Sequence, residues 1–223
     1  MLRRLWLLLL LLAAAPAWAD DLAGLYDAQG QYPNGKAYQG VVQILPYGSA
    51  QAILWKLNDG GKYEGLALRQ GDVLGAAYAP LSKMGFGLVV YRINGGTLDG
   101  AWLTSSNAKG PLGRETLQGP ESLSGQYQIT LGENGDGNTN YTGQVLIKPD
   151  GNTFVFAWLV PKLAYVGRGI RIGNVMVVAY SRDPKQLPGV VAYQVQDQST
   201  LKGVWSPGAA PQVGTETLTR HPQ

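Results

Sequence analysis

The chain has 223 residues and a formal net charge of +3 at pH 7, with 18 basic and 15 acidic residues, one histidine and no cysteine. Without cysteine there is no disulfide framework and no thiol chemistry. The nearly balanced charge, with Lys and Arg spread singly, argues against binding to nucleic acid or to an anionic membrane. The fold must therefore be held together by its hydrophobic core.

Residues 1–19 are predicted to be a secretory signal peptide rather than part of the fold. Arg3 and Arg4 precede an apolar run over residues 5–15, and residues 17–19 read Ala-Trp-Ala, a small-x-small cleavage site. Cleavage removes two basic residues and leaves 16 against 15 acidic ones, a net charge of +1. We expect an exported protein, periplasmic or secreted. An uncleaved membrane anchor is the alternative, but the apolar run is too short to span a bilayer.

Short β-strands are predicted throughout the first half of the mature chain, because apolar and polar residues alternate between turn signals such as Gly71-Asp72 and Asn94-Gly95-Gly96. This alternation is typical of a sheet with one buried face. Gly40, Gly65 and Gly100 fall on the inward face, where they can permit tight curvature or give room to a neighbouring ring. The strands are expected to begin near Leu22, Tyr38, Gln51, Tyr63, Val73, Leu88, Thr97 and Arg114.

The second half of the mature chain repeats the first at a shift of about 102 residues. Chance does not keep so many aromatic and glycine matches in order. The matched pairs include Gly24/Gly125, Tyr26/Tyr127, Tyr38/Tyr141, Trp55/Trp158, Tyr63/Tyr165, Tyr78/Tyr180, Tyr91/Tyr193, Trp102/Trp205 and Glu115/Glu216.

The predicted fold class is all-β, with two tandem antiparallel up-and-down β-barrel-like domains of about eight short strands each. The domains are expected at residues 20–119 and 120–223, each folding independently, with a linker near Gln118–Leu123. A membrane barrel is the alternative, but its strands need about nine to eleven residues, longer than the predicted runs. We therefore expect no membrane insertion of the mature chain.

The second copy contains a series of motifs between residue 141 and residue 218. In order, they are Y-x-G-x-V, W, Y-x-G, V-V-x-Y, L-x-G-x-W and G-x-E-T-L. This string resembles a repeat of small secreted bacterial proteins, some of which are named fibronectin-binding protein. The first copy departs at Arg114 and Leu88, where the second has Thr215 and Val190. The resemblance implies an extracellular protein ligand such as fibronectin. The predicted barrel of about eight strands is also similar in architecture to the lipocalin and avidin folds.

The chain offers little for catalysis. The only histidine, His221, lies near the C-terminus, so common nucleophile–base pairs and zinc ligand sets are missing. Residues 132–138 resemble a fragment of a calcium loop but supply only two acidic residues, and a hairpin loop is the simpler interpretation. We expect no enzyme activity, no cofactor and no metal. An enzyme of unknown substrate remains an alternative, because carboxylate chemistry needs only Asp and Glu.

Glu115 and Glu216 share a strand face with Leu117 and Leu218, so each carboxylate is expected to lean inward. Two interpretations are open: a ligand contact in the barrel mouth, or a structural hydrogen bond closing the last strand onto the first. The structural hydrogen bond is favoured, because buried polar groups normally find their partners within the protein. The tryptophans can fill the interior, the default for a small barrel, or line a pocket beside Tyr63, Tyr78 and Tyr91. The candidate ligand-binding residues are therefore Trp55, Trp102, Glu115, Trp158, Trp205 and Glu216.

The sequence favours an exported, non-catalytic binding protein for an extracellular protein ligand such as fibronectin. A lipocalin-like carrier of a small apolar ligand is the alternative. The interior volume separates the two, since a carrier needs a roomy cavity and surface recognition does not.

Overall fold

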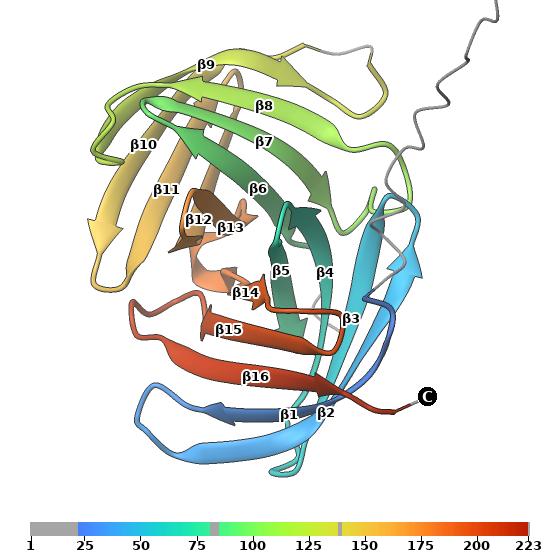
Figure 1. Ribbon diagram of the computed structural model, residues 1–223. Helices are drawn as coiled ribbons and strands as arrows, with labels where there is room; N and C mark the ends of the chain where they lie inside the picture. Colours follow the sequence, from blue (N-terminus) through green and yellow to red (C-terminus); the bar gives the residue numbers. More distant parts are fainter. Residues whose placement is uncertain (1–21, 81–84, 138–139, 223) are drawn as a thin grey trace, which may run out of the picture.

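The computed structural model describes residues 22–80, 85–137 and 140–222, so the predicted signal peptide lies outside the described residues. The chain forms two closed antiparallel barrels of eight strands each and one short 3₁₀-helix, η1 (Pro184–Gln186) (Figure 1). The predicted fold class is confirmed. Each strand of the first repeat begins within two residues of its predicted start.

Barrel A contains the first five strands and the last three, in the order β1-β16-β15-β14-β5-β4-β3-β2. The pairing of β1 with β16 closes it and places the two ends of the described chain side by side. Its strands are β1 (Gly24–Gln31), β2 (Ala37–Tyr47), β3 (Ala50–Leu57), β4 (Lys62–Gln70), β5 (Val73–Pro80), β14 (Gly189–Val195), β15 (Thr200–Ser206) and β16 (Gly214–Arg220).

Barrel B contains the eight strands between them, in the order β10-β11-β12-β13-β6-β7-β8-β9. They are β6 (Gly87–Asn94), β7 (Thr97–Thr104), β8 (Gly113–Gln118), β9 (Gly125–Glu133), β10 (Gly143–Asp150), β11 (Thr153–Val160), β12 (Leu163–Ile172) and β13 (Val175–Ser181).

The barrels do not follow the repeat boundary, which corrects the predicted division into residues 20–119 and 120–223. Each barrel takes five strands from one repeat and three from the other, because the chain crosses between barrels after β5 and again after β13. The expected linker near Gln118–Leu123 is instead a hairpin connection between β8 and β9, which pair within barrel B. The two repeats are thus intertwined by strand exchange.

The sequence does not distinguish this exchange from two self-closed repeats. β6 begins Gly-Leu-Val-Val-Tyr and β14 begins Gly-Val-Val-Ala-Tyr, so β5 can pair with either strand in the same register. In the structure Tyr78 of β5 lies opposite Gly189 of β14, and Tyr180 of β13 lies opposite Gly87 of β6. The repetition that reveals two units also hides which strands close each unit.

Three hydrophobic cores hold the fold: one inside each barrel and a third between the barrels. The third packs the outward faces of β4, β5 and β14 against those of β6, β12 and β13. Leu66, Ala77 and Val190 of barrel A belong to it with Leu88 and Val177 of barrel B. These six central strands are therefore buried on both faces, in contrast to the single buried face predicted. The prediction holds for β2, where buried and exposed residues alternate.

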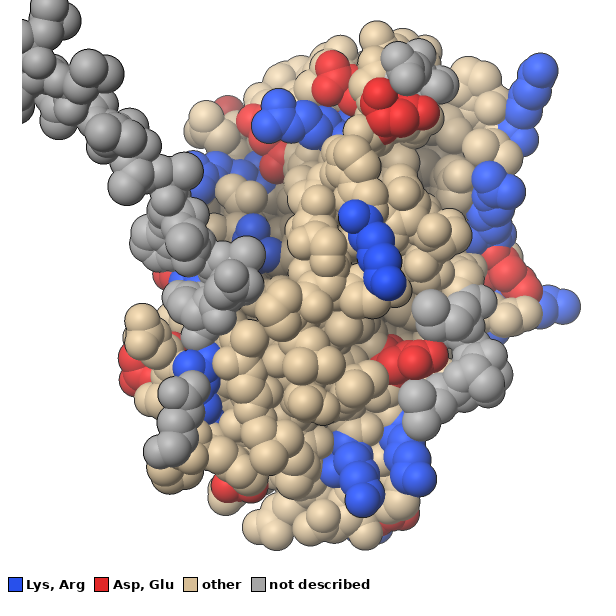
Figure 2. Space-filling model, turned by 90° about the vertical axis from the view of Figure 1, so that its right-hand side faces the viewer, with Lys and Arg blue, Asp and Glu red and all other residues tan. Residues whose placement is uncertain are grey.

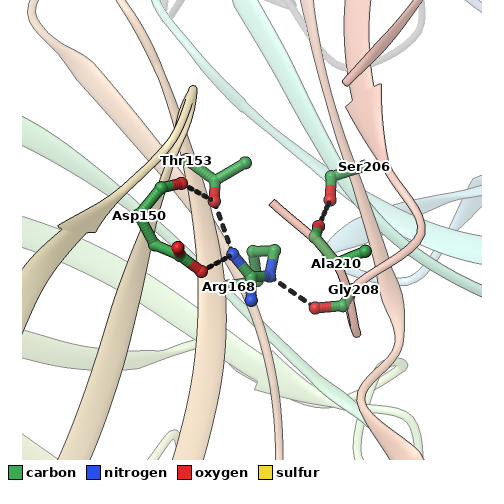
Figure 3. Close-up of polar contacts among 6 residues, drawn as sticks. All are labelled: Asp150, Thr153, Arg168, Ser206, Gly208 and Ala210. Atoms are coloured by element: carbon green, nitrogen blue, oxygen red, sulfur yellow. Dashed lines mark hydrogen bonds and ion pairs between the residues drawn. The ribbon is translucent and has the colours of Figure 1, made fainter. Parts of the chain in front are cut away.

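A polar cluster fastens one edge of this junction (Figure 3). Arg168 on β12 is 6% exposed, and its guanidinium donates to the Asp150 carboxylate at 2.8 Å and to the Thr153 hydroxyl. Its Nε also donates to the Gly208 carbonyl in the β15–β16 loop of barrel A. The corresponding position in the first repeat is Leu66, which packs in the hydrophobic core between the barrels. One edge of the junction therefore has polar contacts where the other has apolar packing.

Glycines on the inward faces make room for rings, as predicted for two of the three positions. A Cβ at Gly100 would lie 2.4 Å from the Tyr91 ring, and one at Gly65 would lie 3.0 Å from Trp55. At Gly65 a backbone atom is closer still, the Ala77 carbonyl oxygen at 2.5 Å. At Gly40 the nearest atom is the Lys56 carbonyl oxygen, 2.6 Å away, and no ring is among its nearest neighbours, so this glycine permits close approach of backbone alone.

Figure 2 shows one face of the molecule, on which Lys and Arg are interspersed with Asp and Glu among many uncharged residues. Over the described residues, no helix has both the length and the apolar character needed to cross a bilayer.

Candidate functional site

A buried carboxylate lies inside each barrel. In barrel A, Glu216 on β16 is 4% exposed and accepts hydrogen bonds from the Tyr38 hydroxyl at 3.0 Å and the Trp55 indole nitrogen at 3.2 Å. The Tyr193 hydroxyl donates a third, short hydrogen bond. These donors come from β2, β3 and β14, so the carboxylate joins strands across the barrel interior.

Barrel B repeats this arrangement around Glu115 on β8. The Tyr141 hydroxyl donates to it at 3.1 Å, the Trp158 indole nitrogen donates at 3.0 Å, and the Tyr91 hydroxyl donates a short hydrogen bond. The expected hydrogen bonding of the inward glutamates is therefore present. The partners differ from those predicted, since neither carboxylate closes the last strand of its barrel onto the first.

Burial sets the electrostatics of both carboxylates. Desolvation raises the pKa of Glu216 above its usual value of 4.5, although the three donated hydrogen bonds oppose this change. Glu115 has a raised pKa for the same reason. Desolvation also raises the pKa of the Tyr193 and Tyr91 hydroxyls, with the adjacent carboxylate as a second cause, so the phenols stay protonated.

A cavity of about 1000 Å³ opens from the interior of barrel A toward the crossover between the barrels. Its inner end is lined by Glu216, Trp55, Tyr38 and Tyr193, and part of its outer wall is formed by residues 181–183 and 185–189. Its other aromatic lining residues are Tyr32, Tyr63, Tyr78, Phe86, Tyr165, Tyr180 and Trp205. A volume of this size is typical of small-molecule sites.

The carboxylate cluster of barrel B does not line this cavity. None of its four described residues is part of the lining: Glu115, Tyr91, Tyr141 and Trp158. The interior of barrel B holds an additional ring, because Phe156 stands where barrel A has Ile53. Phe156 stacks on Trp158 with ring centroids 5.3 Å apart and on Tyr91 at 6.3 Å. The two barrels thus share the carboxylate cluster but differ in how their interiors are filled.

The structure therefore divides the six predicted site residues into two groups. Trp55, Trp205 and Glu216 line the cavity of barrel A, and Trp205 comes from the opposite repeat to Trp55. Trp102, Glu115 and Trp158 lie in barrel B, away from this cavity. The expectation of a filled interior fits Phe156 and its neighbours in barrel B. Barrel A also has a buried core, which includes Tyr26, Ile53 and Leu74, but its interior opens into the cavity.

Sequence reasoning missed Tyr38 and Tyr193, which hold the Glu216 carboxylate. Their repetition as Tyr141 and Tyr91, beside the repetition of the glutamate itself, was the available signal. The crossover residues Ser181–Gly189 were missed for a different reason, since they reach the cavity only through the strand exchange.

Among the described residues, no group of three or more His, Cys, Asp or Glu is placed to hold a metal ion. Comparison of the chain with protein-family models, with curated proteins and with solved structures found no match.

Proposed function

We propose that this protein is an exported, non-catalytic binding protein that holds a small, largely apolar molecule in barrel A. The observation that carries the proposal is the cavity of about 1000 Å³ lined by tyrosine and tryptophan rings, with one carboxylate at its inner end. Small eight-stranded barrels either fill their interior or hold one small ligand, and barrel A has the space for a ligand. An apolar wall with few polar groups is the usual composition of such sites.

The test is a calorimetric screen of small apolar molecules against the mature chain and two matched variants. Leu57 lines the cavity and is buried, so Leu57→Trp should obstruct it. Its counterpart in barrel B is Val160, which is partly buried there, so Val160→Trp adds the same ring elsewhere. A ligand that binds the wild type and Val160→Trp but not Leu57→Trp supports the proposal. Equal binding to all three chains would place the ligand elsewhere.

Binding to an extracellular protein such as fibronectin stays a prediction of the sequence resemblance. The cavity does not bear on it, because a protein ligand would use the outer surface. Immobilised fibronectin is therefore included in the same screen. Binding that is unchanged in Leu57→Trp would favour surface recognition over the cavity.

A further inference from the structure

We propose that the cavity of barrel A selects an organic cation, an ammonium group carried on an apolar body. This inference rests on the proposed function and adds the chemical class of the ligand. It comes from the direction of the hydrogen bonds along the lining, from the buried carboxylate and from the arrangement of the rings.

The tyrosine hydroxyls of the lining have largely used their hydrogens within the protein. Tyr32 donates to the Asp59 carboxylate at 2.5 Å, Tyr78 donates to the Ser206 carbonyl at 3.2 Å, and Tyr180 donates to the Leu103 carbonyl at 3.2 Å. Tyr38 and Tyr193 donate to Glu216. Since a phenol has one hydrogen, each of these oxygens can offer a ligand only its lone pairs.

The charge at the inner end has the same sign as these lone pairs. Within the part of the chain that the structure describes, Glu216 is the only charged residue lining that end, and its neighbours there are neutral phenols and an indole. Arg182 and Lys185 line the outer wall and are exposed. The second acidic residue of the lining, Asp183, already caps η1 by accepting from the Lys185 backbone at 2.9 Å.

The rings form inclined walls rather than a stack. Tyr63 and Tyr78 meet at 84°, and Tyr32 meets Trp205 at 85°. Ring faces carry negative electrostatic potential, which attracts ammonium groups, and cages of aromatic rings recognise quaternary ammonium ligands in this way. One cation of the protein already uses this lining, because the Arg182 guanidinium lies 5.4 Å from the centre of the Tyr165 ring.

At the inner end of the cavity an anionic ligand finds little to bind it, because Arg182 and Lys185 lie at the outer wall. Among the described side chains of the lining, the one buried donor without a hydrogen-bond partner is the Trp205 indole nitrogen. Desolvation raises the pKa of the Tyr38 hydroxyl, and the Trp205 indole nitrogen opposes this rise, although its contact with the hydroxyl lacks the geometry of a hydrogen bond. The indole nitrogen of Trp102 in barrel B is likewise buried without a partner, so this feature belongs to the repeat and not to the cavity.

The experiment compares benzyltrimethylammonium with neopentylbenzene, which has the same shape without the charge, by calorimetry on the mature chain. Phenylacetate serves as the anionic probe. We expect the cation to bind at least about tenfold more tightly than its neutral counterpart, in line with a desolvated cation–π site, and phenylacetate to bind more weakly than either. Equal or tighter binding of the neutral or anionic probe, or no binding of the cation, would overturn the inference.

Glu216→Gln keeps the shape of the carboxylate and removes its charge. It should reduce the affinity for the cation by at least about tenfold and leave the affinity for neopentylbenzene unchanged, while Glu115→Gln in barrel B should change neither. A loss of affinity for both probes would indicate a structural effect of Glu216 and count against the inference. The comparison of probes on the wild-type chain needs no variant, so it decides even if Glu216→Gln does not fold.

Failure of this inference is distinguishable from failure of the proposed function. If the cation does not bind but another molecule binds in a manner blocked by Leu57→Trp, barrel A is a ligand site of another class. If no molecule shows binding sensitive to Leu57→Trp, both proposals fail together.

Discussion

Tyr78 on β5 packs its ring directly against Gly189 on β14, where a Cβ would lie 2.1 Å from the ring. The same contact joins Tyr180 to Gly87 in barrel B, with a Cβ distance of 2.0 Å. Both contacts pair a strand of one repeat with a strand of the other, just where the chain crosses between the barrels. The exchanged strands are therefore fixed in register by a ring seated on a glycine.

The first prediction concerns these glycines. Gly189→Ala should lower the free energy of unfolding by about 1–3 kcal/mol, because the added methyl group overlaps a ring held on a strand within the same sheet. Gly87→Ala should have an effect of the same size. Chemical denaturation monitored by circular dichroism measures both values. Lys202→Ala, at an exposed position of the neighbouring strand β15, is the control and should change stability by less than about 0.5 kcal/mol.

The second prediction concerns the repeats expressed separately. Residues 120–223 alone should form a dimer, because the outward faces of β12, β13 and β14 are buried in the core between the barrels and a single barrel would expose them. Exchange of strands between the two copies reproduces the observed topology. Analytical ultracentrifugation measures the mass of the species in solution.

Residues 20–119 should dimerise likewise, and a mixture refolded together should contain the heterodimer. The intact chain, which carries both repeats, provides the reference for the expected mass. A well-folded monomer of either half would contradict this prediction and would restore the independent folding expected from the sequence.

The sequence predicted the strands of each repeat because period-two alternation and glycine turns are local signals. Gly71 and Gly95 both adopt positive φ in the hairpins where turns were expected. The strand exchange was beyond such signals, since β6 and β14 offer β5 equivalent partners. The run from Val73 to Ala77 is apolar at every position, which is the pattern of a strand buried on both faces. This run lies at the junction between the barrels.

The candidate site was predictable only in part. The repetition of Glu115 and Glu216 indicated inward carboxylates, and the repeated tryptophans indicated the same interior. The difference between the barrels depends on single substitutions such as Ile53 against Phe156, whose effect on volume requires the three-dimensional packing. The outer wall of the cavity depends on the crossover, which the repeat pattern does not encode.

The third prediction tests the space in barrel A without a ligand. Val191 lines the cavity. Its counterpart Val89 packs in the interior of barrel B beside Gly100, where an added Cβ would lie 3.0 Å from the Val89 side chain. Val191→Phe should therefore change the free energy of unfolding by less than about 1 kcal/mol, while Val89→Phe overpacks its barrel and should cost about 1–3 kcal/mol. Paired denaturation curves give the difference. Equal costs would mean that the interior of barrel A has no room for an additional ring.

The last prediction concerns pH. Burial raises the pKa of Glu115 and Glu216 above the usual 4.5 in the folded chain. The folded state therefore binds these two protons more tightly than the unfolded state does. The resulting contribution to stability is fully present below pH 4.5 and is lost as the pH rises through the higher pKa of the folded state. Glutamine at both positions removes the two titrations while keeping the size of the side chains.

The quantity to measure is the free energy of unfolding of the wild type minus that of the double variant, from pH 4 to pH 8. This difference should fall as the pH rises. Only the wild type has two buried carboxyl groups that lose their protons less readily in the folded state than in the unfolded state, so a higher pH favours its unfolded state. Glu121→Gln, at an exposed position in the β8–β9 connection, corrects for the loss of a surface charge. A difference that instead grows with pH would mean that the three donated hydrogen bonds lower the pKa of each carboxyl group by more than desolvation raises it.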